Sequence, residues 1–369
     1  MTVRSGVCVF FLGAAAIVAQ VNAEPPLRLP EYTVYSARVA LQEPAGAFAM
    51  PVTALRYEPL ADVQARNLAE GQADVAIRGG TFENTGFRIG GAALYDPQTG
   101  HYFAEIPVAP AMLSAPRILT GSDEGLAGFN ANAGTVVYDW QRVRARGELA
   151  VTAGQYDSGR LSLYEGVVDA TTVPGRVLAS DAEVSRSVSD GSVPYGDHRF
   201  QRYCFRLQLA DATSQTDLFY GSQSKFFGWP NHYTPFGSDE TENLETVLVA
   251  LNHRVRWDTG DWLEAGAFWR RNKDDYAFNR FAPVGAVHPF QHTTWAQGAS
   301  VSGHDDLGVV ALVYDATVLA DDLKSQLRCN RSPICRLVSH EHCPRSGFPS
   351  NCAPKPRASS FRGKAFRLS

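Results

Sequence analysis

The sequence predicts a mainly β protein, in which an N-terminal α+β domain is followed by an incomplete transmembrane antiparallel β-barrel. Three observations carry this prediction: an export signal, a glycine-rich region of short apolar pieces, and a series of long segments in which apolar and charged residues alternate. The chain has 369 residues, of which 20% are charged, and a formal net charge of -4. This charge excludes nucleic-acid binding through a basic surface and indicates no other partner.

Residues 1–23 are predicted to be a signal peptide that is removed on export. Arg4 precedes an apolar run from Val7 to Val18, and Ala23 ends a stretch of small residues suited to a signal peptidase. The run is shorter than the roughly 20 residues that a membrane-spanning helix needs. No later stretch is as apolar, so the mature chain could cross a membrane only as paired strands.

Residues 24–47 are predicted to be an extended segment. It is rich in proline as far as Pro30 and continues as a β-prone octet from Glu31 to Arg38. A segment with free backbone groups can add as a strand to the sheet of a partner protein. The octet could instead form the first strand of the following domain, and these residues alone leave both possibilities open.

Residues 48–140 are predicted to form a compact α+β domain. Short apolar pieces at Val75–Ile77, Phe87–Ile89 and Arg117–Leu119 are separated by glycines and polar residues, which indicates short strands and loops. The best helix candidate is Val63–Ala69, because the preceding Asp62 can cap its N-terminus.

Residues 141–325 show long alternating segments, enough for about eight to ten barrel strands. In one segment the apolar Tyr203, Phe205 and Leu207 alternate with Arg202 and Arg206. An apolar face toward lipid and a charged face toward a wet lumen are typical of a transmembrane barrel. Half-buried strands of a soluble sandwich give the same alternation, but the export signal and the length of the segments favour the barrel.

Several ordered motifs resemble the plug domain of TonB-dependent outer-membrane receptors: Gln72–Gly80, Ile89–Gly91, Asp96–His101 and Ile118–Gly134. The alternating segments follow where the barrel of that family begins. The resemblance implies a protein of the cell outer membrane, surrounded by outer-membrane lipid, that actively takes up a scarce nutrient of siderophore, corrinoid or oligosaccharide type. It also implies that TonB, with its inner-membrane energising complex, is the protein partner, and that no cofactor is needed.

The resemblance assigns three groups of residues. Arg78 resembles the plug arginine that pairs with carboxylates on the inner barrel wall, although an exposed turn charge is the alternative, and Gly79 and Gly80 allow a tight turn there. The segment that would contact TonB is Tyr32, Thr33, Val34, Tyr35, Ser36 and Ala37. The loops that would face the ligand offer Phe82, Asn84, Tyr95 and Gln98, for which ordinary loop packing is the alternative.

Residues 326–369 do not continue the alternation, and we expect the chain to leave its proper reading frame near Ser325. The barrel would then hold about eight to ten strands, whereas plugged transporters have about 22. We predict no metal site in this tail, because its spacings match none of the usual zinc pairs. The residues concerned are Cys329, Cys335, His340, His342, Cys343 and Cys352.

The sequence predicts no enzyme, because it holds no nucleophile elbow, zinc-protease helix motif or phosphate-binding loop. Asp274 and Asp275 are expected to lie solvated in a loop.

Two rival functions stay open. One is a secreted or surface β-rich binding module, in which Trp229, Tyr233, Trp262 and Trp269 would be platform or core aromatics. The other is a small self-contained outer-membrane barrel whose N-terminal domain lies outside the lumen.

Overall fold

The computed structural model describes residues 50–67, 71–129, 131–282, 290–327, 361–363 and 367–368. The predicted signal peptide, the segment from Tyr32 to Ala37 and most of the tail therefore lie outside the described residues. All described residues belong to one compact unit, residues 41–369. No helix in the described part is both long and apolar enough to cross a membrane.

The N-terminal domain, called the plug domain below (described from Met50 to Trp140), combines short strands with short helices. β1 pairs with β2, and a separate sheet has the order β4-β3-β6-β5, in which β3 and β6 are parallel. The elements are η1 (Pro51–Tyr57), β1 (Ala61–Arg66), β2 (Gln72–Ile77), η2 (Phe82–Asn84), β3 (Thr85–Ile89), β4 (Ala92–Leu94), η3 (Gly100–Tyr102), η4 (Pro110–Met112), β5 (Arg117–Leu119), α1 (Ser122–Ala127) and β6 (Gly134–Tyr138). The α+β prediction is confirmed.

The predicted helix at Val63–Ala69 is wrong over its described part. Residues up to Arg66 belong to β1, where Val63 pairs with Val75 of β2, and Asn67 turns the chain with a φ of 73°. Helix propensity and an N-cap are weak local preferences, and the ladder to β2 outweighs them.

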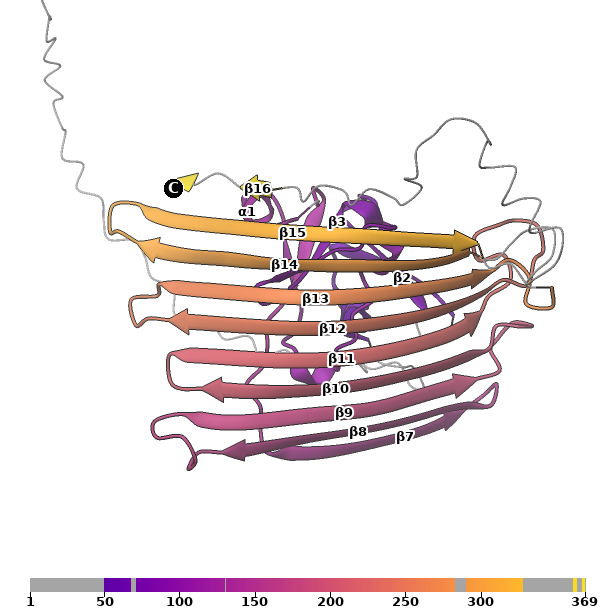
Figure 1. The fold of residues 1–369 in the computed structure, drawn as a ribbon, viewed down its shortest axis with the longest axis horizontal. Coiled ribbons are helices and arrows are strands. Elements are labelled where there is room, and N and C mark those ends of the chain that lie inside the picture. Colours follow the sequence, from indigo (N-terminus) through magenta and orange to yellow (C-terminus); the bar gives the residue numbers. More distant parts are fainter. Residues whose placement is uncertain are drawn as a thin grey trace, which may run out of the picture. The chain divides into compact units, whose positions relative to one another are not determined.

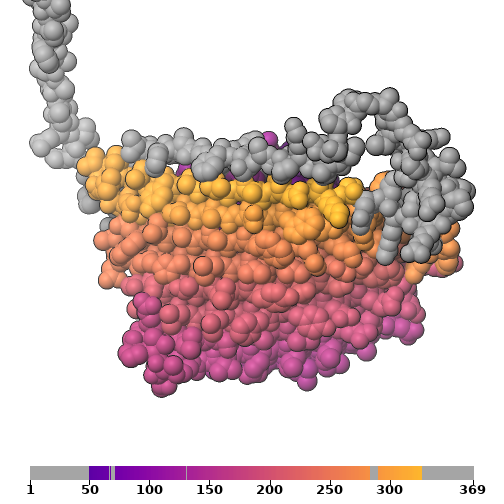
Figure 2. Space-filling view, viewed as in Figure 1, coloured from indigo at the N-terminus to yellow at the C-terminus, as the bar shows by residue number. Residues whose placement is uncertain are grey.

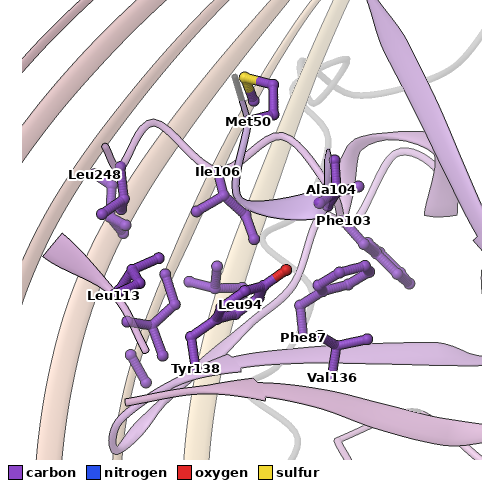
Figure 3. Packing of buried hydrophobic residues seen from close by; sticks show 14 of the residues in the cluster. Met50, Phe87, Leu94, Phe103, Ala104, Ile106, Leu113, Val136, Tyr138 and Leu248 are labelled. Carbon is purple, nitrogen blue, oxygen red and sulfur yellow. The ribbon is translucent and has the colours of Figure 1, made fainter. Parts of the chain in front are cut away.

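The plug core is apolar and continues onto the wall of the large sheet. Leu55, Ile77, Ile106 and Val136 are fully buried, and Leu248 of the sheet belongs to the same cluster (Figure 3). Burying each such side chain contributes about 1.5–3 kcal/mol. The plug domain is therefore packed against the sheet as well as within itself.

The long alternating segments form one antiparallel sheet in chain order, as predicted (Figure 1). β16 (Phe361–Gly363) and β17 (Arg367–Leu368) pair with the last long strand. The long strands are β7 (Arg146–Gly154), β8 (Ser158–Asp169), β9 (Val177–Ser189), β10 (His198–Ala210), β11 (Ser214–Gly228), β12 (Thr241–Arg256), β13 (Trp262–Ala277), β14 (Phe290–Asp306) and β15 (Ala311–Leu327). In the described part β7 and β15 do not pair with each other, so the strands form part of a barrel.

The two faces of this sheet are opposite to those of a soluble protein. On β10, Tyr203, Phe205 and Leu207 are 40–51% exposed, whereas Arg202 and Arg206 are fully buried. The same alternation of exposed and buried residues extends from β8 to β14, and Figure 2 shows this face of the sheet as a continuous surface. A soluble sandwich would bury the apolar face and expose the charged one. The exposed apolar face is therefore evidence against the alternative prediction of a soluble β-rich binding module.

The two ends of the sheet differ in their connections. Segments 155–157, 190–197 and 229–240, and the chain that follows Ala277, join strands at one end, called the loop end below. Segments 170–176, 211–213, 257–261 and 307–310 join strands at the other, the turn end, where three of these four have five residues or fewer. These two ends give the plug domain two distinct sets of neighbours.

Candidate functional site

Three buried ion pairs join the plug domain to the inner face of the sheet. Arg88 Nη1 lies 2.7 Å from Asp315 Oδ2, and Arg270 Nη1 lies 2.7 Å from Asp96 Oδ2. Lys225 Nζ lies 2.8 Å from Glu105 Oε2. Every one of these side chains is at most 5% exposed. Since an unpaired buried charge is strongly destabilising, each pair ties the position of the plug domain to the wall.

Arg270 of β13 binds several groups of the plug domain at once. Besides Asp96, it donates to the carbonyl oxygens of Tyr95, Tyr102 and Glu105. The Asp96 carboxylate also accepts from Thr294 Oγ1 at 3.0 Å. Arg270 thus holds the plug segment from Tyr95 to Glu105 against the wall.

The inner wall also carries charged pairs within the sheet. Arg202 binds Glu183 through two hydrogen bonds of 2.8 Å, and Arg206 binds Asp181 through bonds of 2.9 and 2.7 Å. Two-bond pairing of this kind compensates much of the hydration that a guanidinium loses on burial. Arg206 also donates to Gln141 O at 2.8 Å, which fixes the chain where it leaves the plug domain.

Close contact between backbones replaces side-chain contact at one place on the wall. Gly266 of β13 lies against Gly91 of the plug domain, and a Cβ at Gly266 would lie 2.7 Å from Gly91 Cα. Only glycine permits so close an approach. The Asn252 side chain accepts from the Gly91 N–H at 2.7 Å beside it, so the turn of the plug is both packed and hydrogen-bonded.

A second group of contacts lies at the loop end and joins plug side chains to two carboxylates of the wall. Tyr102 donates to Glu242 Oε1 at 2.6 Å, and Gln98 donates to Asp274 Oδ2 at 2.7 Å. Tyr233 of loop 229–240 donates to the other Glu242 oxygen at 2.9 Å. Burial and then the Glu242 carboxylate raise the pKa of Tyr102 well above its usual value, so its hydroxyl stays a donor.

Asp274 therefore corrects the expectation of a solvated loop. It lies in β13 and is 3% exposed. The polar run around it belongs to a strand because the inner face of this sheet is lined with charged and polar side chains.

Arg78 does not pair with the wall in the structure. It is exposed, has a φ of 52°, and donates its backbone N–H to Leu60 O; no carboxylate in the described part of the chain pairs with it. Gly79, with a φ of 74°, and Gly80 are exposed in the same turn. The predicted tight turn is present. In the described residues, the arginine of the plug domain that is buried against the wall is Arg88. Its position between Phe87 and Ile89 in a buried strand was the sequence signal for it.

The four residues predicted to face the ligand separate into two kinds. Gln98 lies at the loop end on Asp274, and Phe82 stacks on His101 there, with ring centroids 4.2 Å apart. Tyr95 packs on Phe103 and Phe129. Asn84 uses its carbonyl oxygen to accept from Asn132 N and Ala133 N. Tyr95 and Asn84 therefore have packing and backbone roles that suffice to explain them.

In the described part of the chain, cavities lie at both ends of the sheet. One, of about 340 Å³, is lined at the loop end by Val193, Pro194, Tyr195, Trp229, Pro230 and Asp239. The other, of about 280 Å³, lies between the plug domain and the wall at the turn end, beside the Arg88–Asp315 pair. Within the described residues, no cluster of three or more histidine, cysteine, aspartate or glutamate side chains could hold a metal ion.

Removing the Tyr102 hydroxyl is expected to loosen the plug at the loop end. Tyr102→Phe leaves a Glu242 oxygen without its donor, and a buried hydrogen bond to a charged group contributes about 1.5–3 kcal/mol. The midpoint of denaturant unfolding in detergent should fall accordingly. Tyr220→Phe is the control, because Tyr220 is 48% exposed on the outer face. Equal midpoints for the two variants would show that the Tyr102–Glu242 contact does not stabilise the protein.

Comparison with known proteins finds likeness in structure only. No protein-family model and no curated protein sequence matches the chain. Among solved structures, the ferric yersiniabactin uptake receptor FyuA from Yersinia pestis is similar with a TM-score of 0.52 and 14% identity, over 75% of this chain and 47% of that chain. The copper transporter OprC gives a TM-score of 0.58 and 13% identity, over 78% of this chain and 45% of that one.

The FrpB iron transporter from Neisseria meningitidis gives a TM-score of 0.57 and 13% identity, over 74% of this chain and 46% of that one. At these identities the shared property is the fold, a plug domain against the inner face of a barrel wall. The chain spans less than half the length of these three proteins.

Proposed function

We propose that this chain supplies the plug domain and part of the barrel wall of a TonB-dependent outer-membrane receptor that takes up a scarce nutrient. The observation that carries the proposal is the sheet with an apolar outer face and a charged inner face that is clamped to the plug domain by buried ion pairs. An apolar outer band and a polar interior are the properties of a barrel in lipid. The fold shared with uptake receptors for iron and copper supports the same conclusion.

The loop end faces the outside of the cell in this proposal, and the turn end faces the periplasm. Outer-membrane barrels have short periplasmic turns and longer external loops. Substrate would bind between the loops 190–197 and 229–240 and the plug residues Gln98 and Phe82 below them. The rival small barrel needs the N-terminal domain outside the lumen, whereas here Asp96 and Glu105 pair with the inner wall.

Transport would follow when TonB pairs with the segment from Tyr32 to Ala37 and pulls on it. Strand addition provides backbone hydrogen bonds strong enough to transmit a force. The plug domain can then move only if contacts such as Arg270–Asp96 and Lys225–Glu105 break. These ion pairs hold the pathway closed until force is applied, and no covalent chemistry is involved.

A proline in the predicted TonB segment is expected to abolish uptake. Val34→Pro removes a backbone N–H and blocks pairing with a partner strand. A siderophore, a corrinoid and an oligosaccharide are tried as radiolabelled nutrients. Cells that produce the variant should lose energy-dependent accumulation of the nutrient that the unchanged chain takes up, while still binding it at the surface. Leu27→Pro is the control, since it adds a proline to a stretch that already holds Pro25, Pro26 and Pro30.

The same assay in cells that lack TonB completes the test. Uptake should disappear there for the unchanged chain. Uptake that is independent of both TonB and residue 34 would disprove the proposed function, as would recovery of the chain as a soluble monomer without detergent.

A further inference from the structure

His101 lies at the loop end of the plug domain. In the part of the chain that is described, one of its ring nitrogens is hydrogen-bonded and the other is not. Its Nδ1 lies 2.6 Å from Asp74 Oδ1. A carboxylate partner fixes the hydrogen on Nδ1, so that Nε2 keeps its lone pair. The His101 side chain is 22% exposed and that of Asp74 is 5% exposed. Nε2 has no hydrogen-bond partner among the described residues.

The imidazole ring is fixed in place by its neighbours. It stacks on Phe82 with an interplanar angle of 21°. On either side in the chain, Gln98 and Tyr102 are bound to the wall through Asp274 and Glu242. The ring is therefore oriented before any ligand arrives, which lowers the entropy cost of binding.

Carboxyl groups lie beside and near His101. The Asp74 carboxylate lies directly behind the ring, and Glu242 and Asp274 lie in the neighbouring contacts. Two buried acceptor atoms there, Gln98 Oε1 and Asp274 Oδ1, have no donor in the part of the chain that the structure describes. A neutral imidazole backed by a carboxylate is the arrangement by which proteins bind transition-metal ions.

We infer that His101 Nε2 binds the metal ion of a metal-chelate substrate, at a coordination position that the chelate leaves open. This inference rests on the proposed function and names its substrate class as a chelate of a borderline transition metal, because imidazole suits Cu²⁺, Ni²⁺ and Zn²⁺. No cluster of three or more metal-binding side chains is found among the described residues, so the remaining ligands come from the chelate or from water.

The test is a titration of the full chain in detergent with Cu²⁺–nitrilotriacetate, a chelate that leaves coordination open on the ion, followed by electron paramagnetic resonance. The bound chelate should show hyperfine coupling to one imidazole nitrogen, and this coupling should be lost in His101→Gln. Asp74→Asn should weaken the same site by about 10–100-fold, because it removes the carboxylate that orients the ring.

His304→Gln is the matched control. His304 Nδ1 lies 3.8 Å from Asp261 Oδ1 at the turn end, and its side chain is 31% exposed, so it is a second histidine beside a carboxylate. The inference requires that His304→Gln keep the site intact. Unchanged binding in His101→Gln, or equal loss in both variants, would overturn it, the second outcome showing adventitious binding to surface histidines. Far-UV circular dichroism of each variant reports whether its sheet has formed.

The inference and the proposed function fail separately. If His101→Gln takes up a Cu²⁺ chelate at the unchanged rate in cells with TonB, the metal contact is wrong and the receptor proposal stands. If Cu²⁺ binds His101 but uptake needs neither TonB nor residue 34, the metal site stands and the receptor proposal falls.

Discussion

Replacing Arg270 by methionine is expected to destabilise the protein by about 3–5 kcal/mol, the cost of removing one partner from a buried ion pair. Asp96 would keep a buried charge with no cation beside it, and the carbonyl oxygens of Tyr95, Tyr102 and Glu105 would lose their common donor. The measurement is denaturant unfolding in detergent, together with protease sensitivity of the plug domain.

The neighbouring arginine provides the control for this prediction. Arg271 is 38% exposed and lies 3.9 Å from Glu245, and exposed pairs of this kind contribute at most about 1 kcal/mol. Arg271→Met should therefore change the unfolding midpoint little. The double variant Arg270→Met with Asp96→Leu should recover part of the loss, because it removes the buried charge as well. If Arg270→Met and Arg271→Met unfold alike, the ion pair does not hold the plug to the wall.

Placing an arginine on the outer face is the second large effect. Phe205 lies near the middle of β10 and is 51% exposed. In a soluble protein Phe205→Arg would change stability by at most about 0.5 kcal/mol. In a bilayer the same substitution should cost about 2–4 kcal/mol, since the guanidinium would lie at midplane depth.

A second position on β10, at a different depth in the membrane, provides the comparison with Phe205. Gln201 lies on the same face but nearer the loop end, where an added arginine should cost about 0–1 kcal/mol. The measurement is unfolding of both variants after folding into lipid vesicles. Costs that are equal and small at both positions would mean that this face does not contact lipid, and the outer-membrane proposal would then be wrong.

Alternation made the wall predictable, because the pattern that places a side chain on one face or the other is local. Tyr203, Phe205 and Leu207 needed no knowledge of other strands. The same pattern misled at Asp274, because a run of polar residues was interpreted as a loop. In a barrel strand polar side chains can fill the inner face, so polarity alone does not mark a loop.

The site was less predictable, because its contacts join distant parts of the chain. Arg78 lies in a plug motif and Arg88 directly precedes one, and what distinguishes them is the partner Asp315, which is separated from Arg88 by 227 residues. Likewise Val63 was assigned to a helix because its strand partner Val75 is not encoded in the local pattern. Gln98 was proposed from the sequence, whereas the contacts of Tyr102, Glu242 and His101 depend on where the loop end brings strands together.

Alkylation of the Cys204 thiol can report movement of the plug domain. Its thiol is 4% exposed on β10 and donates to the carbonyl oxygen of Pro107 in the plug domain at 3.3 Å. An alkylating reagent can reach this sulfur only while the Pro107 segment is away from the wall. The labelling rate at Cys204, followed by peptide mass spectrometry, therefore equals the fraction of time that the plug is displaced multiplied by the intrinsic rate of the exposed thiol. Displacement of the plug domain can thus be measured in living cells at a native residue, without introducing a cysteine.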